Sequence, residues 1–158
     1  MDYEFTPHQP ADSDIAKTEE WFKKAVPNPT QKNLQTQVGC MFEEFAETMA
    51  ALSSTDENTK MALHYVKEAV KALGEGLKNS EPSLVVTDRK EFLDGCMDVI
   101  VTATGSAYME GLNPTGGMGE VNRSNFSKFD ENGQPILDKN LKVMKGPNYF
   151  KPNLDPYL

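Results

Sequence analysis

Apolar side chains recur at steps of three and four residues along most of the chain before Gly111. This spacing places them on one face of an α-helix. The pattern predicts four helices, at about residues 12–25, 30–52, 59–78 and 88–110. Strand-like alternation is nearly absent, so the sequence predicts an all-α fold in which these helices form a four-helix bundle.

Each of the last three of these helices has an apolar stripe that we expect to face the core. The stripes are Leu34, Val38, Met41, Phe45, Met49 and Leu52, then Ala62, Val66, Ala69, Leu73 and Leu77, then Leu93, Met97, Ile100, Thr104 and Tyr108. Asp12 or Ser13, Thr30 and Thr87 are placed to cap the first, second and fourth helices. Gly74 and Gly76 predict fraying near the end of the third helix.

The pattern weakens after Gly111, which is placed to end the fourth helix. Residues 114–127 predict a short fifth helix, and residues 130–133 predict a tight turn within a small hairpin. Later prolines oppose further helix. We therefore expect a single domain over residues 1–158, with a helical core at about 12–128 and an irregular C-terminal arm at about 129–158.

Composition and charge narrow the classes of function. The chain has 158 residues, of which 38% are hydrophobic, and a net charge of −8 that opposes tight binding to nucleic acid. No apolar run approaches the roughly 18 residues that span a bilayer, and the N-terminal residues lack the basic flank of a signal peptide. We expect a cytoplasmic protein without a membrane partner, in which Cys40 and Cys96 are buried thiols.

Acidic residues are concentrated in two short segments of the predicted second and fourth helices. They are Glu43, Glu44 and Glu47 in the second helix, and Glu91, Asp94 and Asp98 in the fourth. Steps of three and four place their carboxylates one turn apart, where like charges repel unless a cation lies between them. One acidic stripe is more often a solvated surface. Two stripes beside core positions predict a Mg²⁺ site between facing helices, because Mg²⁺ prefers carboxylate oxygens, water and phosphate.

The segment from Glu43 to Glu47 spells the motif EExxE. With it, the chain resembles the all-α NTP pyrophosphohydrolases that include MazG and phosphoribosyl-ATP pyrophosphohydrolase. The family's second motif is ExxD, and Asp98 with the apolar run that follows it fits the aspartate. Gly95 stands where the family has glutamate, but Glu91-x-x-Asp94 keeps the spelling one turn earlier.

The resemblance implies metal ligands and a general base. Because Gly95 takes the place of the family's glutamate, either Asp94 replaces it as a ligand or the metal set is shifted by one turn. We favour Asp94 with Asp98, helped by Glu91, so that Glu44, Glu47, Asp94 and Asp98 would hold Mg²⁺, with Mn²⁺ as a substitute. Either Glu43 or Glu91 would hold the attacking water as general base, and the sequence does not choose between them.

Two later segments, residues 120–128 and 142–149, are similar to those of MazG-like proteins often found in phages. They contain amide and cationic donors suited to phosphate oxygens, namely Asn122, Arg123, Asn125, Lys128 and Lys145. Tyr149 and Trp21 are candidates for stacking on a base. Gln37, with Gln31 and Gln35, is a candidate for reading a base edge, although glutamines are more often simply at the surface.

The resemblance implies Mg²⁺-dependent hydrolysis of nucleoside or deoxynucleoside triphosphates to the monophosphate and pyrophosphate, which would serve nucleotide-pool control. Water would attack the α-phosphorus in line with the leaving pyrophosphate. The resemblance also implies a homodimer or homotetramer, in the host cytoplasm if a phage encodes the chain. Two alternatives stay open: phosphoribosyl-ATP hydrolysis, and a non-catalytic helical interaction module, which the departure at Gly95 keeps in play.

Overall fold

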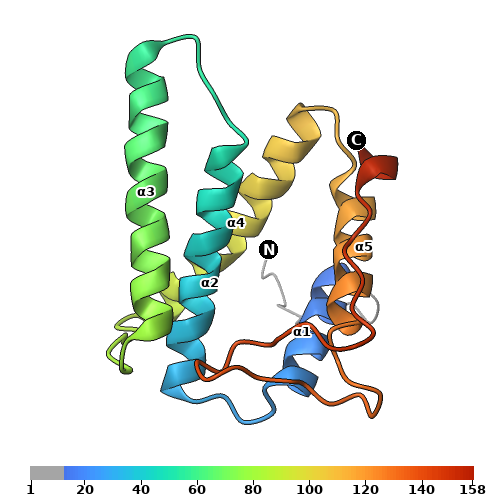
Figure 1. The fold of residues 1–158 in the computed structure, drawn as a ribbon. Coiled ribbons are helices and arrows are strands. Elements are labelled where there is room, and N and C mark those ends of the chain that lie inside the picture. Colours follow the sequence, from blue (N-terminus) through green and yellow to red (C-terminus); the bar gives the residue numbers. More distant parts are fainter. Residues whose placement is uncertain (1–12) are drawn as a thin grey trace, which may run out of the picture. The chain divides into compact units, whose positions relative to one another are not determined.

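The computed structural model describes residues 13–158, which form five α-helices joined by turns and irregular segments (Figure 1). The helices are α1 (Asp14–Ala25), α2 (Gln31–Ala50), α3 (Glu57–Asn79), α4 (Arg89–Met109) and α5 (Pro114–Phe126), and a 3₁₀ turn, η1, spans Asp155–Tyr157. No β-strand occurs in this range. The predicted all-α class, the short fifth helix and the irregular C-terminal arm are therefore confirmed. None of the described helices is long and apolar enough to cross a membrane.

Local capping signals set the starts of these helices. Ser13 Oγ accepts a hydrogen bond from the backbone N–H of Ala16, whereas Asp12 lies outside the described residues. Thr30 and Asn33 form a capping box at the start of α2. Asp56 caps α3, so that helix begins at Glu57, two residues earlier than predicted. Local sequence thus predicts helix existence well and boundaries to within a turn.

The described chain forms two compact units. One contains residues 28–89 and 137–144, and so holds α2, α3 and a short piece of the C-terminal arm. The other contains the described residues up to 27, residues 90–136 and residues 145–158, and so holds α1, nearly all of α4, α5 and η1.

In the first unit, α2 and α3 pack side by side along most of their length (Figure 1). Their backbones come close at Gly39 and Gly74: a Cβ added to Gly39 would lie 2.8 Å from the Gly74 carbonyl oxygen, and one added to Gly74 would lie 2.7 Å from the Gly39 carbonyl oxygen. The backbones can meet there because neither residue has a side chain. The predicted fraying at Gly74 is wrong, since α3 continues to Asn79 and Gly74 is buried.

The predicted apolar stripe of α3 is also wrong for most of its members. Val66 and Leu73 are about half exposed, and Ala62 and Ala69 are exposed as well. The face of α3 that meets α2 contains Gly74. Gly74 follows Leu73 by one position, so this face lies about 100° around the helix axis from the predicted stripe. Less exposed positions therefore fall on the neighbouring face, at Leu63, Lys67, Val70, Gly74, Leu77 and Lys78.

In the second unit, α1 packs on α5 and on the segment that follows it. Trp21 is buried, its ring stacks on the ring of Phe129 with centroids 5.9 Å apart, and its Nε1–H donates to the Asn125 carbonyl oxygen at 2.7 Å. At the C-terminus, the Asn113 backbone N–H donates to the Tyr157 carbonyl oxygen at 2.9 Å. These contacts hold the start of the described chain and its end on the same helix, α5.

Helix α4 has no buried residue. Within its own unit it packs against neither α1 nor α5. Leu93 is 61% exposed and Tyr108 is 73% exposed. The prediction that its apolar stripe faces inward is wrong for the single described chain, because no other helix of its unit covers that face. Gly111 ends the helix as predicted, with φ of +84°.

The C-terminal arm contains two tight turns. The first is the predicted one: Asp130 Oδ1 accepts from the backbone N–H groups of Asn132 and Gln134. The second was not predicted. It spans residues 137–144, where Asp138 Oδ1 accepts from the backbone N–H groups of Asn140 and Lys142, and an isolated bridge joins Leu137 to Val143. We call residues 137–144 the arm hairpin.

Candidate functional site

Glu43, the first acid of the EExxE segment, is held by two lysines from other elements. Lys78 of α3 donates to Glu43 Oε1 at 2.6 Å, and Lys142 of the arm hairpin donates to Glu43 Oε2 at 3.0 Å. The side chain of Lys78 is only 11% exposed, and its Cγ lies 2.8 Å from where a Cβ on Gly39 would be. The glycine at the helix crossing therefore also makes room for this lysine.

Glu43 and its neighbours, Lys142 and Cys40, have shifted pKa values. The hydrogen bond from Lys78 lowers the pKa of Glu43 most, and Lys142 lowers it further, against an opposing effect of burial. Burial alone would lower the pKa of Lys142, but its bond to Glu43 and the charges of Cys40, Glu43 and Glu44 together raise it. Burial raises the pKa of Cys40. Near neutral pH, Glu43 is therefore ionised, Lys142 is protonated and Cys40 is a neutral thiol.

The other two acids of the motif, Glu44 and Glu47, are exposed on α2. Glu44 follows Glu43 by one position, so it points about 100° away around the helix axis from the side that Lys78 occupies. Glu47 lies one turn further on. Glu44 thus points to a different side of α2 from Glu43, whereas Glu47 lies on the same side one turn later and differs from Glu43 in being exposed.

The acids of α4, Glu91, Asp94 and Asp98, are all exposed. A Cβ added to Gly95 would meet nothing within 4 Å. Packing in the described chain therefore does not require glycine at the position where the resemblance expects glutamate.

The donor set on each acidic helix consists of carboxylate oxygens, which are the ligands that Mg²⁺ and Mn²⁺ favour. The two sets belong to different compact units, Glu44 and Glu47 to one and Asp94 and Asp98 to the other. In residues 13–158, no group of three or more His, Cys, Asp or Glu side chains is arranged to hold a metal ion. The chemistry of the donors fits the ion, and the assignment of the four ligands stays a prediction.

Two of the predicted phosphate-binding residues, Asn122 and Arg123, lie on α5 and have structural partners. Asn122 is buried: its Oδ1 accepts from Thr18 Oγ1 at 2.8 Å and its Nδ2 donates to the Asp14 carbonyl oxygen at 2.9 Å, so it ties α5 to α1. Arg123 forms a two-pronged ion pair with Glu120 at 2.6 and 2.7 Å. That pair holds the pKa of Glu120 at about 2, with help from the Asn153 backbone N–H.

The remaining predicted anion-binding residues lie on α5, the segment after it and the last part of the arm. Lys128 Nζ donates to Asn125 Oδ1 at 2.7 Å and lies 5.6 Å from the centroid of the Trp21 ring. Lys145 Nζ lies 4.7 Å from the centroid of the Tyr149 ring. The backbones beside these lysines meet, because the Gly146 N–H donates to the Lys128 carbonyl oxygen at 3.0 Å. Lys128 and Lys145 are thereby brought close in space.

The glutamines that precede the acidic motif differ from one another. Gln37 is exposed, which leaves it accessible to a ligand. Gln35 is completely buried, so the view that it is a surface glutamine is wrong. Its Nε2 donates to the Leu77 and Glu81 carbonyl oxygens, and its Oε1 accepts from the backbone N–H groups of Ser83 and Leu84. Gln35 thus supplies hydrogen-bond partners to backbone groups at the end of α3 and in the loop after it. The signal for this was its place on the same face of α2 as Val38 and Gly39.

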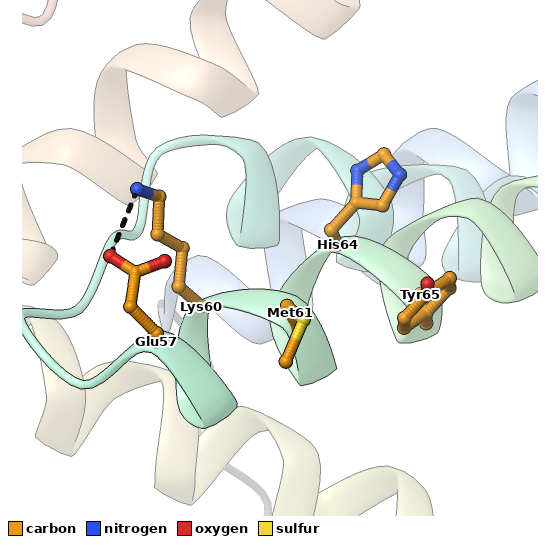
Figure 2. A pocket seen from close by; sticks show the side chains of 5 residues that line it. All are labelled: Glu57, Lys60, Met61, His64 and Tyr65. Atoms are coloured by element: carbon orange, nitrogen blue, oxygen red, sulfur yellow. Dashed lines mark hydrogen bonds and ion pairs between the residues drawn. The ribbon is translucent and has the colours of Figure 1, made fainter.

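One shallow hollow lies along the start of α3, with a volume of about 290 Å³ (Figure 2). It is lined by Glu57, Lys60, Met61, His64 and Tyr65, all from this one helix. None of the residues that the sequence assigns to a site lines it. An open surface on one side of one helix does not enclose a ligand, so we assign the hollow no function.

The two cysteines are free and half-buried rather than fully buried.

No protein-family model and no curated protein matches the chain. Among solved structures, the chain is similar to a protein of Exiguobacterium sp. 255-15 described as a putative NTP pyrophosphohydrolase. The TM-score is 0.59, the sequences are 22% identical, and the match covers 92% of this chain and 90% of that chain. The two proteins therefore share an all-helical fold over most of their length.

Proposed function

We propose that the chain is a nucleoside triphosphate pyrophosphohydrolase that depends on Mg²⁺. One observation carries the proposal. On α2, two carboxylates of a three-acid motif, Glu44 and Glu47, are exposed, while the third, Glu43, is half-buried and paired with two lysines. The fold shared with a protein described as an NTP pyrophosphohydrolase supports the same reading.

In this proposal, Glu44, Glu47, Asp94 and Asp98 hold the divalent ion. When bound, Mg²⁺ would neutralise phosphate charge and lower the pKa of the attacking water. Glu91 or Glu43 orients that water and takes its proton as the new bond to the α-phosphorus forms. The bond from the α-phosphorus to the bridging oxygen breaks, and the pair of electrons leaves with pyrophosphate. The other product is the nucleoside monophosphate.

The cations of the second unit are proposed to bind the triphosphate. Lys128 and Lys145, together with Arg123, offer positive charge in a chain whose net charge is −8. Asn125 and Tyr149 accompany these lysines, and Gln37 is proposed to read the base. Asn122 is better explained as a structural link, because both polar atoms of its amide are used between α1 and α5.

We also propose that the chain works as a homodimer or homotetramer. The exposed apolar residues of α4, among them Leu93, Val101 and Tyr108, support this assembly. Apolar side chains repeated along one helix and left open to water are typical of a surface that another subunit covers.

The direct test is to incubate the protein with each canonical NTP and dNTP and Mg²⁺, and to separate the products by ion exchange. We expect a monophosphate and pyrophosphate as the primary products. Orthophosphate and a diphosphate would show cleavage at the wrong bond. Turnover of phosphoribosyl-ATP but of no dNTP would instead favour a phosphoribosyl-ATP pyrophosphohydrolase. No Mg²⁺-dependent turnover of any of these substrates would favour a non-catalytic interaction module.

A further inference from the structure

The EExxE segment contains three acids, but their surroundings divide them into two classes. Glu43 uses both carboxylate oxygens on lysines, at 2.6 Å to Lys78 and 3.0 Å to Lys142. The two ammonium groups occupy one acceptor site on each oxygen, and their positive charges oppose the binding of a metal ion or the uptake of a proton at the same carboxylate. Glu44 and Glu47 face solvent instead.

The partners of Glu43 connect three separate pieces of the chain. Lys78 lies in the last turn of α3, and Lys142 lies at the end of the arm hairpin. The hairpin is docked on the same two helices by two further bonds. Thr36 Oγ1 donates to the Asn140 carbonyl oxygen at 2.8 Å, and Asn140 Nδ2 donates to Asn79 Oδ1 at 3.0 Å. Glu43 therefore lies where α2, α3 and the arm meet.

We infer that Glu43 is a positioning residue: paired with Lys78 and Lys142, it anchors the arm hairpin on α2, and it neither binds the metal nor takes the proton of the attacking water. This inference rests on the proposed function and leaves Glu91 as the general base. It also gives the arm a task in substrate binding, because Lys142 precedes Lys145 by three positions.

The test compares Glu43→Gln with Glu47→Gln, and Lys142→Ala with Lys142→Arg. For Glu43→Gln we expect kcat to fall by less than about tenfold, short of the about 10²–10⁴-fold contribution of a general base. We expect KM to rise by about two- to fivefold, the range that a partly exposed ion pair supplies. Lys142→Ala should reproduce the KM change, and Lys142→Arg should restore it. Lys139→Ala, at an exposed neighbour in the arm hairpin, is the matched control.

Two measurements do not depend on turnover. Calorimetric titration with Mn²⁺ should give Glu43→Gln an affinity within about threefold of the wild type, and Glu47→Gln an affinity more than about tenfold weaker. Urea unfolding without metal should show that Glu43→Gln and Lys142→Ala together shift the midpoint by less than the sum of their separate shifts.

A Glu43→Gln variant that loses Mn²⁺ affinity as Glu47→Gln does, or kcat by 10²-fold or more, would overturn the inference. So would additive midpoint shifts in urea, because they would mean that Glu43 and Lys142 do not stabilise each other. If the wild-type protein shows no turnover, the proposed function fails separately, and the urea experiment still decides whether Glu43 anchors the hairpin.

Discussion

Helices α2 and α4 contain similar acidic segments, yet only α2 is packed within its compact unit. Helix α2 buries Gln35, Val38, Gly39 and Ala46, and it contacts α3 along most of its length. Helix α4 buries no residue, and it packs on neither α1 nor α5. The same spacing of carboxylates thus occurs on a helix that packs on another helix of its unit and on a helix that does not.

An acidic stripe specifies which carboxylates share a helix side, but it does not specify which of them stay exposed. Spacing alone brings carboxylates to one side of a helix, and it does so equally in α2 and α4. Packing then decides which of them are available. On α2 it assigns Glu43 to lysines and leaves Glu47 exposed, whereas on α4 Glu91, Asp94 and Asp98 are all exposed.

The largest expected effect comes from removing one ligand from each helix. We predict that Glu47→Gln and Asp98→Asn each lower turnover by more than about a hundredfold, beyond the loss typical for groups that merely support a metal ligand. Helical circular dichroism should be unchanged, because both side chains are exposed. A loss of turnover in Glu47→Gln with wild-type rates in Asp98→Asn would mean that the two helices are not equivalent, and that the acids of α4 form only a solvated surface.

A smaller loss is expected at the cations of the second unit. A charge-assisted hydrogen bond contributes about 1.5–3 kcal/mol, so Lys128→Ala should raise the dissociation constant of a non-hydrolysable dNTP analogue by roughly ten- to a hundredfold. Calorimetric titration with Mg²⁺ present measures it, with the exposed Lys151→Ala as control. Unchanged affinity in Lys128→Ala would confine the site to the acidic helices. Truncating the chain after Asn122 is less informative, because it also removes Phe129 from the Trp21 ring.

The helix crossing gives a prediction for stability alone. Gly39→Ala places a Cβ 2.8 Å from the Gly74 carbonyl oxygen, and overpacking of this kind costs about 1–3 kcal/mol. Gly76→Ala, in the same α3, meets nothing within 4 Å and should stabilise by about 0.5–1 kcal/mol, because alanine favours helix. Urea denaturation of both variants measures the contrast. Equal effects would mean that α2 and α3 do not cross at Gly39.

The smallest expected effect is a dependence on acid at Glu120. Its pKa in the folded chain is about 2, below the ordinary value of 4.5, because Arg123 donates to its carboxylate. The pair therefore stabilises the fold above pH 4.5, and this contribution is lost as the pH falls from there through about 2. Glu120→Gln should flatten the decline of the unfolding midpoint over this window. An identical decline in both proteins would assign the acid sensitivity to other carboxylates.

Much of the fold follows from local sequence. Caps such as Thr30 and the left-handed Gly111 are signals within one turn of chain, and helix positions followed from them. The faces of α3 and α4 did not. Choosing a face needs the partner, and a helix that meets another through Gly74 gives no hydrophobic signal at the contact. Gln35 was missed for a related reason, because a polar residue buried by loop hydrogen bonds looks like a surface one.

The candidate site also has features that local sequence predicts and features that depend on residues far apart in the chain. The acids could be named from the sequence because their chemistry and spacing are local. The pairing of Glu43 with Lys142 could not, since these residues lie 99 positions apart and only folding brings them together. The same holds for Asn122, whose partner Thr18 is 104 positions away. Such residues resemble ligand-binding groups until their partners are known.

The crossing of α2 and α3 also bears on how this protein can diverge. A carboxylate can move by a turn along a helix and still be an oxygen donor, as the spelling of Glu91 and Asp94 around Gly95 illustrates. Gly39 and Gly74 have no such freedom, because any other residue at either position would place its Cβ against the backbone of the opposite helix. We therefore expect a chain that keeps this helix crossing to keep glycine at both positions, 35 residues apart, even where its carboxylates have moved by a turn.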